Sequence, residues 1–175
     1  MYLKRITPPQ AETITLNEVK AHLRIDGDEE NELLSALITT AREMAEEYTR
    51  RSLVQQEWEL GIQELTTKVY LPRSPVREIT YFAIDGQELG TDSYLLIGEE
   101  TFYAKKPLKA VMPDGIVIRY TAGFDVDNIP EAIKRAILML VGHLYENREG
   151  QPPENGYSLP PTVKVILRPY RAVML

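Results

Sequence analysis

The stretch EAIKRAILMLVGHLYENRE, residues 131–149, decides the fold of this chain. On a helix, its apolar side chains lie around most of the circumference. The narrow strip that interrupts them consists of Glu131, Arg135, Gly142 and Glu146. Burying one large apolar side chain stabilises a fold by about 1.5–3 kcal/mol, so such a helix must be covered on most sides. Pro130 suits the first turn, and residues 128–149 are therefore predicted as a central helix.

Two further helices are predicted in residues 15–53. Thr15 and Glu18 have the spacing of a capping box, so a short helix is expected to begin there and to end near Ile25. One amphipathic helix cannot cover the central helix alone. The first helix, the C-terminal segment or a neighbouring subunit is therefore expected to share that task.

The second of these helices is amphipathic. The acidic stretch DGDEENE, residues 26–32, suits the positive end of a helix dipole, and Asp28 is predicted to cap the helix there. At about 100° per residue, the apolar side chains form one stripe as far as Arg51. The polar side chains of the opposite face include Glu43, Glu46 and Glu47.

After the second helix the pattern changes to a period of two, which is typical of half-buried strands. Short runs of this kind, separated by turn residues, fill residues 54–123. Because the connections are too short for helical crossovers, the strands are expected to pair antiparallel. The order of elements predicts an α+β fold, a helical core with a mostly antiparallel β insertion between the helices. The predicted strands are 54–62, 68–71, 76–84, 94–97, 101–104 and 116–120.

The C-terminal segment, residues 159–175, carries basic but no acidic side chains. Its basic side chains are Lys164, Arg168 and Arg171. The segment is interpreted as a short helix or an extended tail, because Pro169 limits how far a helix continues. The charge pattern indicates either a tail with its own partner or the basic end of a small helix.

The composition of the 175 residues excludes several classes of site. The chain has no Cys, which excludes disulfides and thiolate metal sites, and two His without Cys cannot form a closed zinc site unless carboxylates complete it. The net charge of −6 makes it a poor general binder of nucleic acid, and no apolar run approaches the length of a membrane span. No phosphate-binding, dinucleotide-binding or hydrolase motif occurs. No catalytic, cofactor-binding or metal-binding residue is therefore predicted.

Five segments of the sequence, taken together and in order, point to one protein family. They are LNEVKAHLRIDGDEENELLSALITTAREMAEEYTRRSL (16–53), YLPRSPVREIT (70–80), IVIRYTAGF (116–124), IPEAIKRAILMLVGHLYENRE (129–149) and LPPTVKVILRPYR (159–171). In this order, and over almost the whole chain, they resemble the head–tail connector (head-completion adaptor) family of tailed bacteriophages.

The resemblance implies a structural virion protein that catalyses no reaction. It implies a single connector domain over residues 1–175, and a homo-oligomeric, dodecameric ring beneath the portal protein of the capsid. Such a ring extends the DNA channel and presents a surface to a tail-side head-closure protein. The resemblance places the protein at the capsid–tail junction of the virion after synthesis in the bacterial host cytoplasm. DNA would pass through without being bound specifically, and no membrane or cofactor is involved.

The resemblance also suggests roles for particular residues. The C-terminal segment would dock to the portal, with candidates Lys164, Arg168, Tyr170 and Arg171. Candidates for the subunit interface or the core are Leu138, Met139, His143, Tyr145 and Arg148. A channel for DNA should not grip phosphates, so acidic side chains are suited to its wall. Glu43, Glu46 and Glu47 are channel-lining candidates, with a solvated outer face as the alternative.

Two other functions remain open at this point. A DNA-packaging accessory factor would bind nucleic acid through the basic tail and through a loop with Lys105, Lys106 and Lys109. An enzyme would use carboxylates in the β region, but nothing in the sequence selects a pair of them.

Overall fold

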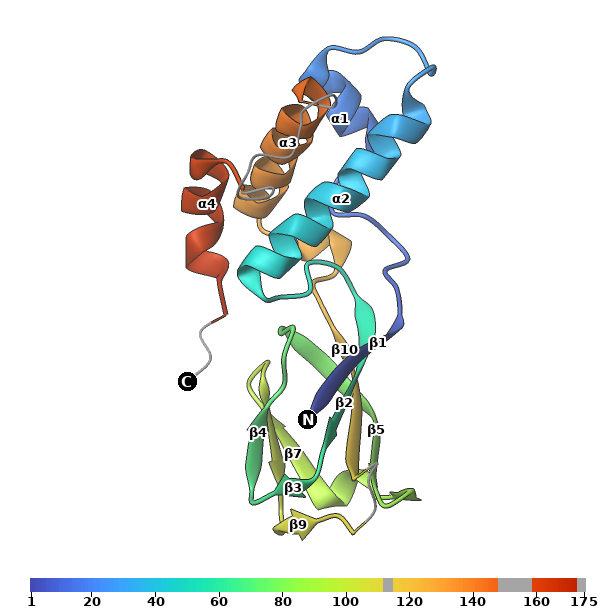
Figure 1. The fold of residues 1–175 in the computed structure, drawn as a ribbon, viewed down its shortest axis with the longest axis vertical. Coiled ribbons are helices and arrows are strands. Elements are labelled where there is room, and N and C mark those ends of the chain that lie inside the picture. The colour runs from blue at the N-terminus through green and yellow to red at the C-terminus, as the bar shows by residue number, and fades with distance from the viewer. Residues whose placement is uncertain (112–114, 148–158, 173–175) are drawn as a thin grey trace.

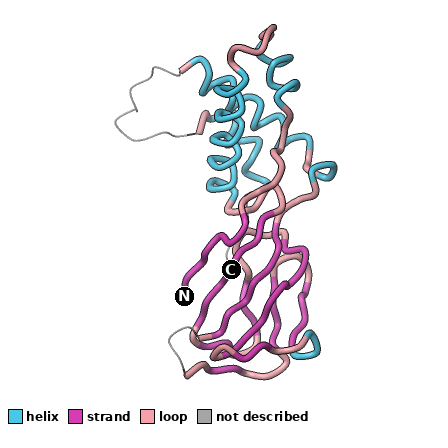
Figure 2. Tube along the Cα trace, turned by 90° about the vertical axis from the view of Figure 1, so that its right-hand side faces the viewer, coloured by secondary structure: helices cyan, strands magenta, loops and turns pink. Residues whose placement is uncertain are grey.

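The computed structural model describes residues 1–111, 115–147 and 159–172, and it has two lobes along its longest axis (Figure 1). The α-helices lie in one lobe and the strands in the other, with the short 3-10 helix η1 (Thr91–Ser93) among the strands, as Figure 2 shows in a second view. The helical lobe contains α1 (Leu16–Leu23), α2 (Asn31–Thr49), α3 (Glu131–Glu146) and α4 (Pro161–Leu167). The β lobe is formed mainly by the chain between α2 and α3. The predicted α+β class, with a β insertion between helices, is confirmed.

Helix α3 is the centre of the helical lobe and contacts α1, α2 and α4. Its side chains Ile133, Ile137 and Leu140 are fully buried, which confirms that this helix is covered on most sides. Gly142 was placed on the polar strip, and this is wrong. It is buried opposite His22 and Leu23 of α1, and its small size allows the two helices to approach.

The start of α1 is the predicted capping box. The Glu18 backbone N–H donates to Thr15 Oγ1 at 3.2 Å, and the Thr15 backbone N–H donates to Glu18 Oε2 at 2.6 Å. Helix α2 differs from the prediction, because its N-cap is Glu30 and no side chain caps it. The Asp28 carboxylate instead accepts from Lys20 Nζ at 2.7 Å. Asp28 therefore joins the two helices rather than capping the second.

The capping box is expected to give a pH-dependent contribution to stability. Hydrogen bonds from the backbone and side chain of Thr15 lower the pKa of Glu18 below 4.5. This contribution is therefore present at neutral pH and is lost as the pH falls through the lowered pKa. Thr15→Ala should lower the free energy of unfolding by about 1 kcal/mol. The difference between wild type and Glu18→Gln should shrink on acidification, as measured by urea denaturation at neutral and acidic pH. A difference that stays constant would contradict this.

The β lobe contains three antiparallel sheets. The largest has the order β1-β2-β10-β5-β6, and the smaller ones are β4-β8-β7 and β3-β9. The strand bounds are β1 (Tyr2–Thr7), β2 (Gln56–Ile62), β3 (Glu64–Leu65), β4 (Lys68–Tyr70), β5 (Val76–Ile84), β6 (Gln87–Glu88), β7 (Tyr94–Ile97), β8 (Thr101–Ala104), β9 (Leu108–Lys109) and β10 (Ile116–Ala122). The longer predicted strands are all present, and β5, β7 and β8 have the predicted bounds.

Strand β1 was not predicted, and it brings the N-terminus into the β lobe. It pairs with β2 at the edge of the largest sheet, where every one of its residues is exposed. The ring of Tyr2 lies directly over Gly61, where a Cβ atom would be 2.1 Å from it. An edge strand exposed on both faces has no burial pattern, which explains why the sequence did not reveal it.

Each lobe has its own hydrophobic core. In the β lobe, the buried rings of Phe82 and Phe102 lie 4.8 Å apart and edge-to-face, and Tyr94 stacks on Phe102 at 5.1 Å. Three connections, residues 8–15, 50–55 and 123–130, cross between the lobes. We call this junction the waist.

Candidate docking surfaces

The C-terminal segment is fixed to the helical lobe and returns the chain to the waist. Val163 and Leu167 of α4 are buried in the helical core, and the short helix η3 (Arg168–Tyr170) follows α4. The Arg51 Nε donates to the Tyr170 carbonyl oxygen at 2.7 Å, and the Ala172 N–H donates to the Thr49 carbonyl oxygen at 2.8 Å. The segment is therefore a short helix with an ordered continuation.

All four predicted docking residues lie on this segment. Arg168 and Arg171 are exposed, whereas Lys164 and Tyr170 are half-buried. The Arg171 guanidinium lies over the Tyr48 ring, 5.8 Å from its centroid. Val165 is 71% exposed and was not predicted as part of this surface. Helical spacing could have revealed it, because Val165 points away from the face that contains Val163 and Leu167.

The candidate residues of α3 have different environments. Leu138 and Met139 are half-buried and pack against the helical core. The Tyr145 hydroxyl donates to Glu30 Oε2 at 2.6 Å, which ties α3 to the start of α2. His143 is exposed, so the core alternative is wrong for it, because its side chain lies outside the faces covered by neighbouring helices. Arg148 lies outside the described residues.

Of the channel-lining candidates, Glu46 is buried, and the prediction that it lies on an exposed face is wrong. The Arg42 Nη1 lies 3.0 Å from Glu46 Oε2, and Arg42 is only 3% exposed. Arg42 Nε also lies 2.8 Å from Glu12 Oε2. Glu43 and Glu47 are exposed, with Arg5 and Arg73 respectively as ion-pair partners.

Glu46 links the helical lobe to the β lobe through hydrogen bonds. Its Oε1 accepts from the Leu53 backbone N–H and from Gln56 Nε2, both at 2.8 Å. Burial raises the pKa of this carboxyl, although the Leu53 N–H and Arg42 act in the opposite direction. The side chain therefore connects the last turns of α2 to the start of β2 within the waist.

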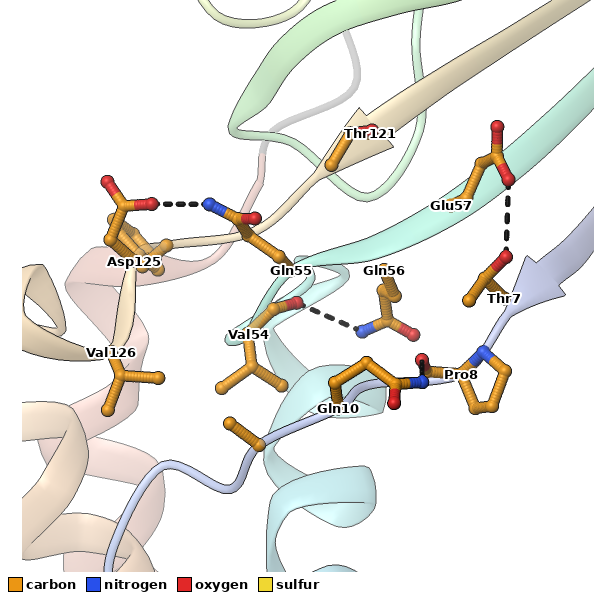
Figure 3. A pocket seen from close by; sticks show the side chains of 12 residues that line it. Thr7, Pro8, Gln10, Val54, Gln55, Gln56, Glu57, Thr121, Asp125 and Val126 are labelled. Carbon is orange, nitrogen blue, oxygen red and sulfur yellow. Dashed lines mark hydrogen bonds between the residues drawn. The ribbon is translucent and has the colours of Figure 1, made fainter.

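A groove of about 550 Å³ lies at the waist, between the β1–α1 connection and the strands β2 and β10 (Figure 3). We call it the waist groove. Its lining residues are Thr7, Pro8, Gln10, Ala11, Val54, Gln55, Gln56, Glu57, Thr121, Phe124, Asp125 and Val126. The sequence did not reveal it, because these residues come from three separate segments, 7–11, 54–57 and 121–126.

Over residues 1–111, 115–147 and 159–172, no cluster of three His, Asp or Glu side chains is arranged to hold a metal ion. None of the helices within these ranges is long and apolar enough to span a membrane.

The model of one protein family, described as head completion protein, matches residues 12–173. This chain belongs to the head completion protein family. The family is one of structural virion components and not of enzymes, in agreement with the predicted class. No curated protein matches the sequence.

Solved structures share the fold of this head completion protein over its whole length. A chain from the neck of an empty gene transfer agent particle, computed with C6 symmetry, has a TM-score of 0.81 and 21% identity. A chain from the neck of the native particle, computed with C12 symmetry, has a TM-score of 0.78 and 19% identity. A chain from the virion of the native particle has a TM-score of 0.76 and 21% identity. Each comparison covers 100% of this chain and 97% of the other.

Proposed function

We propose that this head completion protein forms a ring at the junction of capsid and tail, where it extends the DNA channel below the portal. The observation that carries this proposal is the match over 97% of the length of chains from a particle neck. Those necks were computed with sixfold and twelvefold symmetry, which supports copies arranged around an axis. A dodecameric ring with a tail-side head-closure protein below it is the arrangement that we propose.

The C-terminal segment is the proposed contact with the portal. Its cations are presented on a short helix that is anchored by buried side chains, so they are pre-positioned for a partner. Among the described residues, Lys164 and Arg168 take part in no ion pair. A partner with an acidic surface would neutralise them, and such complementarity sets specificity and register.

The same proposal assigns roles to exposed and half-buried residues of α2 and α3. Leu138, Met139, His143 and Tyr145 of α3 are subunit-interface candidates, together with Arg148. Glu43 and Glu47 stay candidates for the channel wall, and Glu46 does not. The overall charge of −6 supports a channel that lets DNA slide without retention.

Replacing Lys164, Arg168 and Arg171 together by Glu is expected to weaken binding to purified portal rings by at least about tenfold. The measurement is sedimentation of the mixture, with helix content checked by circular dichroism. A matched control is Lys105→Glu, Lys106→Glu and Lys109→Glu, which makes the same charge change at exposed positions of the β lobe.

The same variants separate the proposal from a DNA-packaging factor. If the variant with Lys164, Arg168 and Arg171 replaced by Glu still binds portal rings as the wild type does, the docking role of the C-terminal segment is contradicted. Tight, salt-dependent binding of duplex DNA that either triple change abolishes would favour the packaging factor instead.

A further inference from the structure

The waist groove is lined by acceptors and by negative charge. Its charged residues are Glu57 and Asp125, and none of its lining residues is Lys or Arg. Asp125 has Arg77 as a partner at 3.1 Å. Glu57 accepts only from hydroxyl groups, Thr7 Oγ1 at 3.2 Å and Thr80 Oγ1 at 2.8 Å, and forms no ion pair within the described residues. The groove therefore holds one carboxylate that forms no ion pair within the described residues, with the charge of Arg119 nearby in its own chain.

A second acceptor belongs to the neighbouring residue of β2, Gln56, which also lines the groove. Gln56 is only 3% exposed, and its Oε1 has no hydrogen-bond partner in the described part of the chain. The Nε2 of the same amide is held by Glu46 Oε1 and by the Val54 carbonyl oxygen. Figure 3 shows the amide nitrogen directed toward Val54 and the amide oxygen turned to the other side, toward Pro8 and Gln10. A buried acceptor of this kind calls for a donor.

The rest of the lining is partly apolar. Pro8, Val54, Phe124 and Val126 supply apolar surface beside uncharged polar side chains. An aliphatic stem that ends in a cationic donor matches these walls and acceptors, and this is the structure of an arginine or lysine side chain. An anion such as a phosphate is disfavoured by the two carboxylates.

We infer that the waist groove receives a cationic side chain from a second copy of this chain, and that Arg50 supplies it. This rests on the proposed ring. If the long axis runs along the channel, the waist of each copy meets the waist of its neighbour, because rotation about an axis preserves height. The contact is heterologous, so two different sides of the waist must be complementary.

Arg50, at the end of α2, lies on the side of the waist opposite the groove. The end of α2 is on the left of the waist in Figure 1, and the β1–α1 connection that borders the groove is on the right. Arg50 is the C-cap of α2, is exposed, and forms no ion pair with any described residue. The nearby Arg51 and Arg73 are already held by partners in their own chain.

Charge reversal on each side tests this pairing. Glu57→Lys and Arg50→Glu, each alone, are expected to weaken subunit association by at least about tenfold. An equimolar mixture should regain it, because each copy then offers a complementary side to the other. Glu57→Gln removes the charge while an acceptor for the two threonines remains, and it should give a smaller loss. The control is Glu88→Lys, at an exposed position of β6.

Association is measured by sedimentation velocity and native mass spectrometry, alone and on portal rings, with circular dichroism to verify folding. If Glu57→Lys assembles as well as Glu88→Lys, or if the mixture does not recover, the inference is overturned while the ring proposal stands. If the wild-type chain stays monomeric even on portal rings, both are overturned.

Discussion

Glu46→Ala is expected to lower the free energy of unfolding by about 3–5 kcal/mol, because it removes one of the two carboxylates closest to a buried arginine together with the acceptor of two buried donors. Arg42 would lose the carboxylate 3.0 Å away while remaining 97% buried by its surroundings. The Leu53 N–H and the Gln56 amide would lose their acceptor as well. Glu12 would remain 2.8 Å from Arg42 Nε, and the unmade hydrogen bonds at buried donors add to the cost of the weakened ion pairing.

The matched control is Glu43→Ala, one turn earlier on the exposed side of α2. Its ion-pair distances to Arg5 and Arg42 are 3.8 and 3.9 Å, and its side chain is 52% exposed, so the expected change is within about 0.5 kcal/mol. Glu46→Gln should lie between the two, since the amide oxygen still accepts from the Leu53 N–H. Chemical denaturation of the three variants measures this order. Equal stability of Glu46→Ala and Glu43→Ala would show that the interactions of Glu46 at the waist do not stabilise the fold.

Phe102→Ala is expected to lower the free energy of unfolding by about 3–5 kcal/mol, because it opens a cavity at the centre of the β lobe. The ring is fully buried in β8 and packs against Phe82 and Tyr94 at 4.8 and 5.1 Å. Aromatic pairs in this geometry contribute beyond the buried area alone. No small movement of one strand can fill the space, since β4 and β7 pair with β8 on its two sides.

The control for Phe102→Ala is Ile97→Ala on β7, where the side chain is 53% exposed and the expected loss is less than about 1 kcal/mol. Thermal and urea unfolding, followed by circular dichroism and by Trp58 fluorescence, measure both. If Phe102→Ala unfolds at the same denaturant concentration as Ile97→Ala, the β lobe does not depend on this aromatic cluster.

Local patterns in the sequence predicted much of the fold. The capping box, the apolar circumference of α3 and the period-two runs depend on neighbours along the chain, and the structure contains all three. Helical and strand periodicity place side chains on faces without knowledge of the rest of the fold. The basic character of the C-terminal segment was seen from a change in charge along the chain, and its docking role stays a prediction from the family resemblance.

Polar residues whose partners lie in another element were not predictable. Glu46 belongs to the polar side of α2 by periodicity, yet it is buried because Leu53 and Gln56 lie over it. Asp28 has the position of a helix cap, yet it binds Lys20 of the preceding helix. In both cases a partner that is distant on the helical wheel or in another element satisfies the polar group better than water does.

The sequence by itself determined the family, the α+β class, the central helix and the basic C-terminal segment. Each of these can be inferred from local periodicity, from charge or from the order of segments. Only the tertiary structure decided the edge position of β1, the burial of Glu46 and the composition of the waist groove. Those features arise where segments that are separate in the sequence meet. Their energies depend on which polar groups are shielded from water together, and a linear pattern does not contain that information.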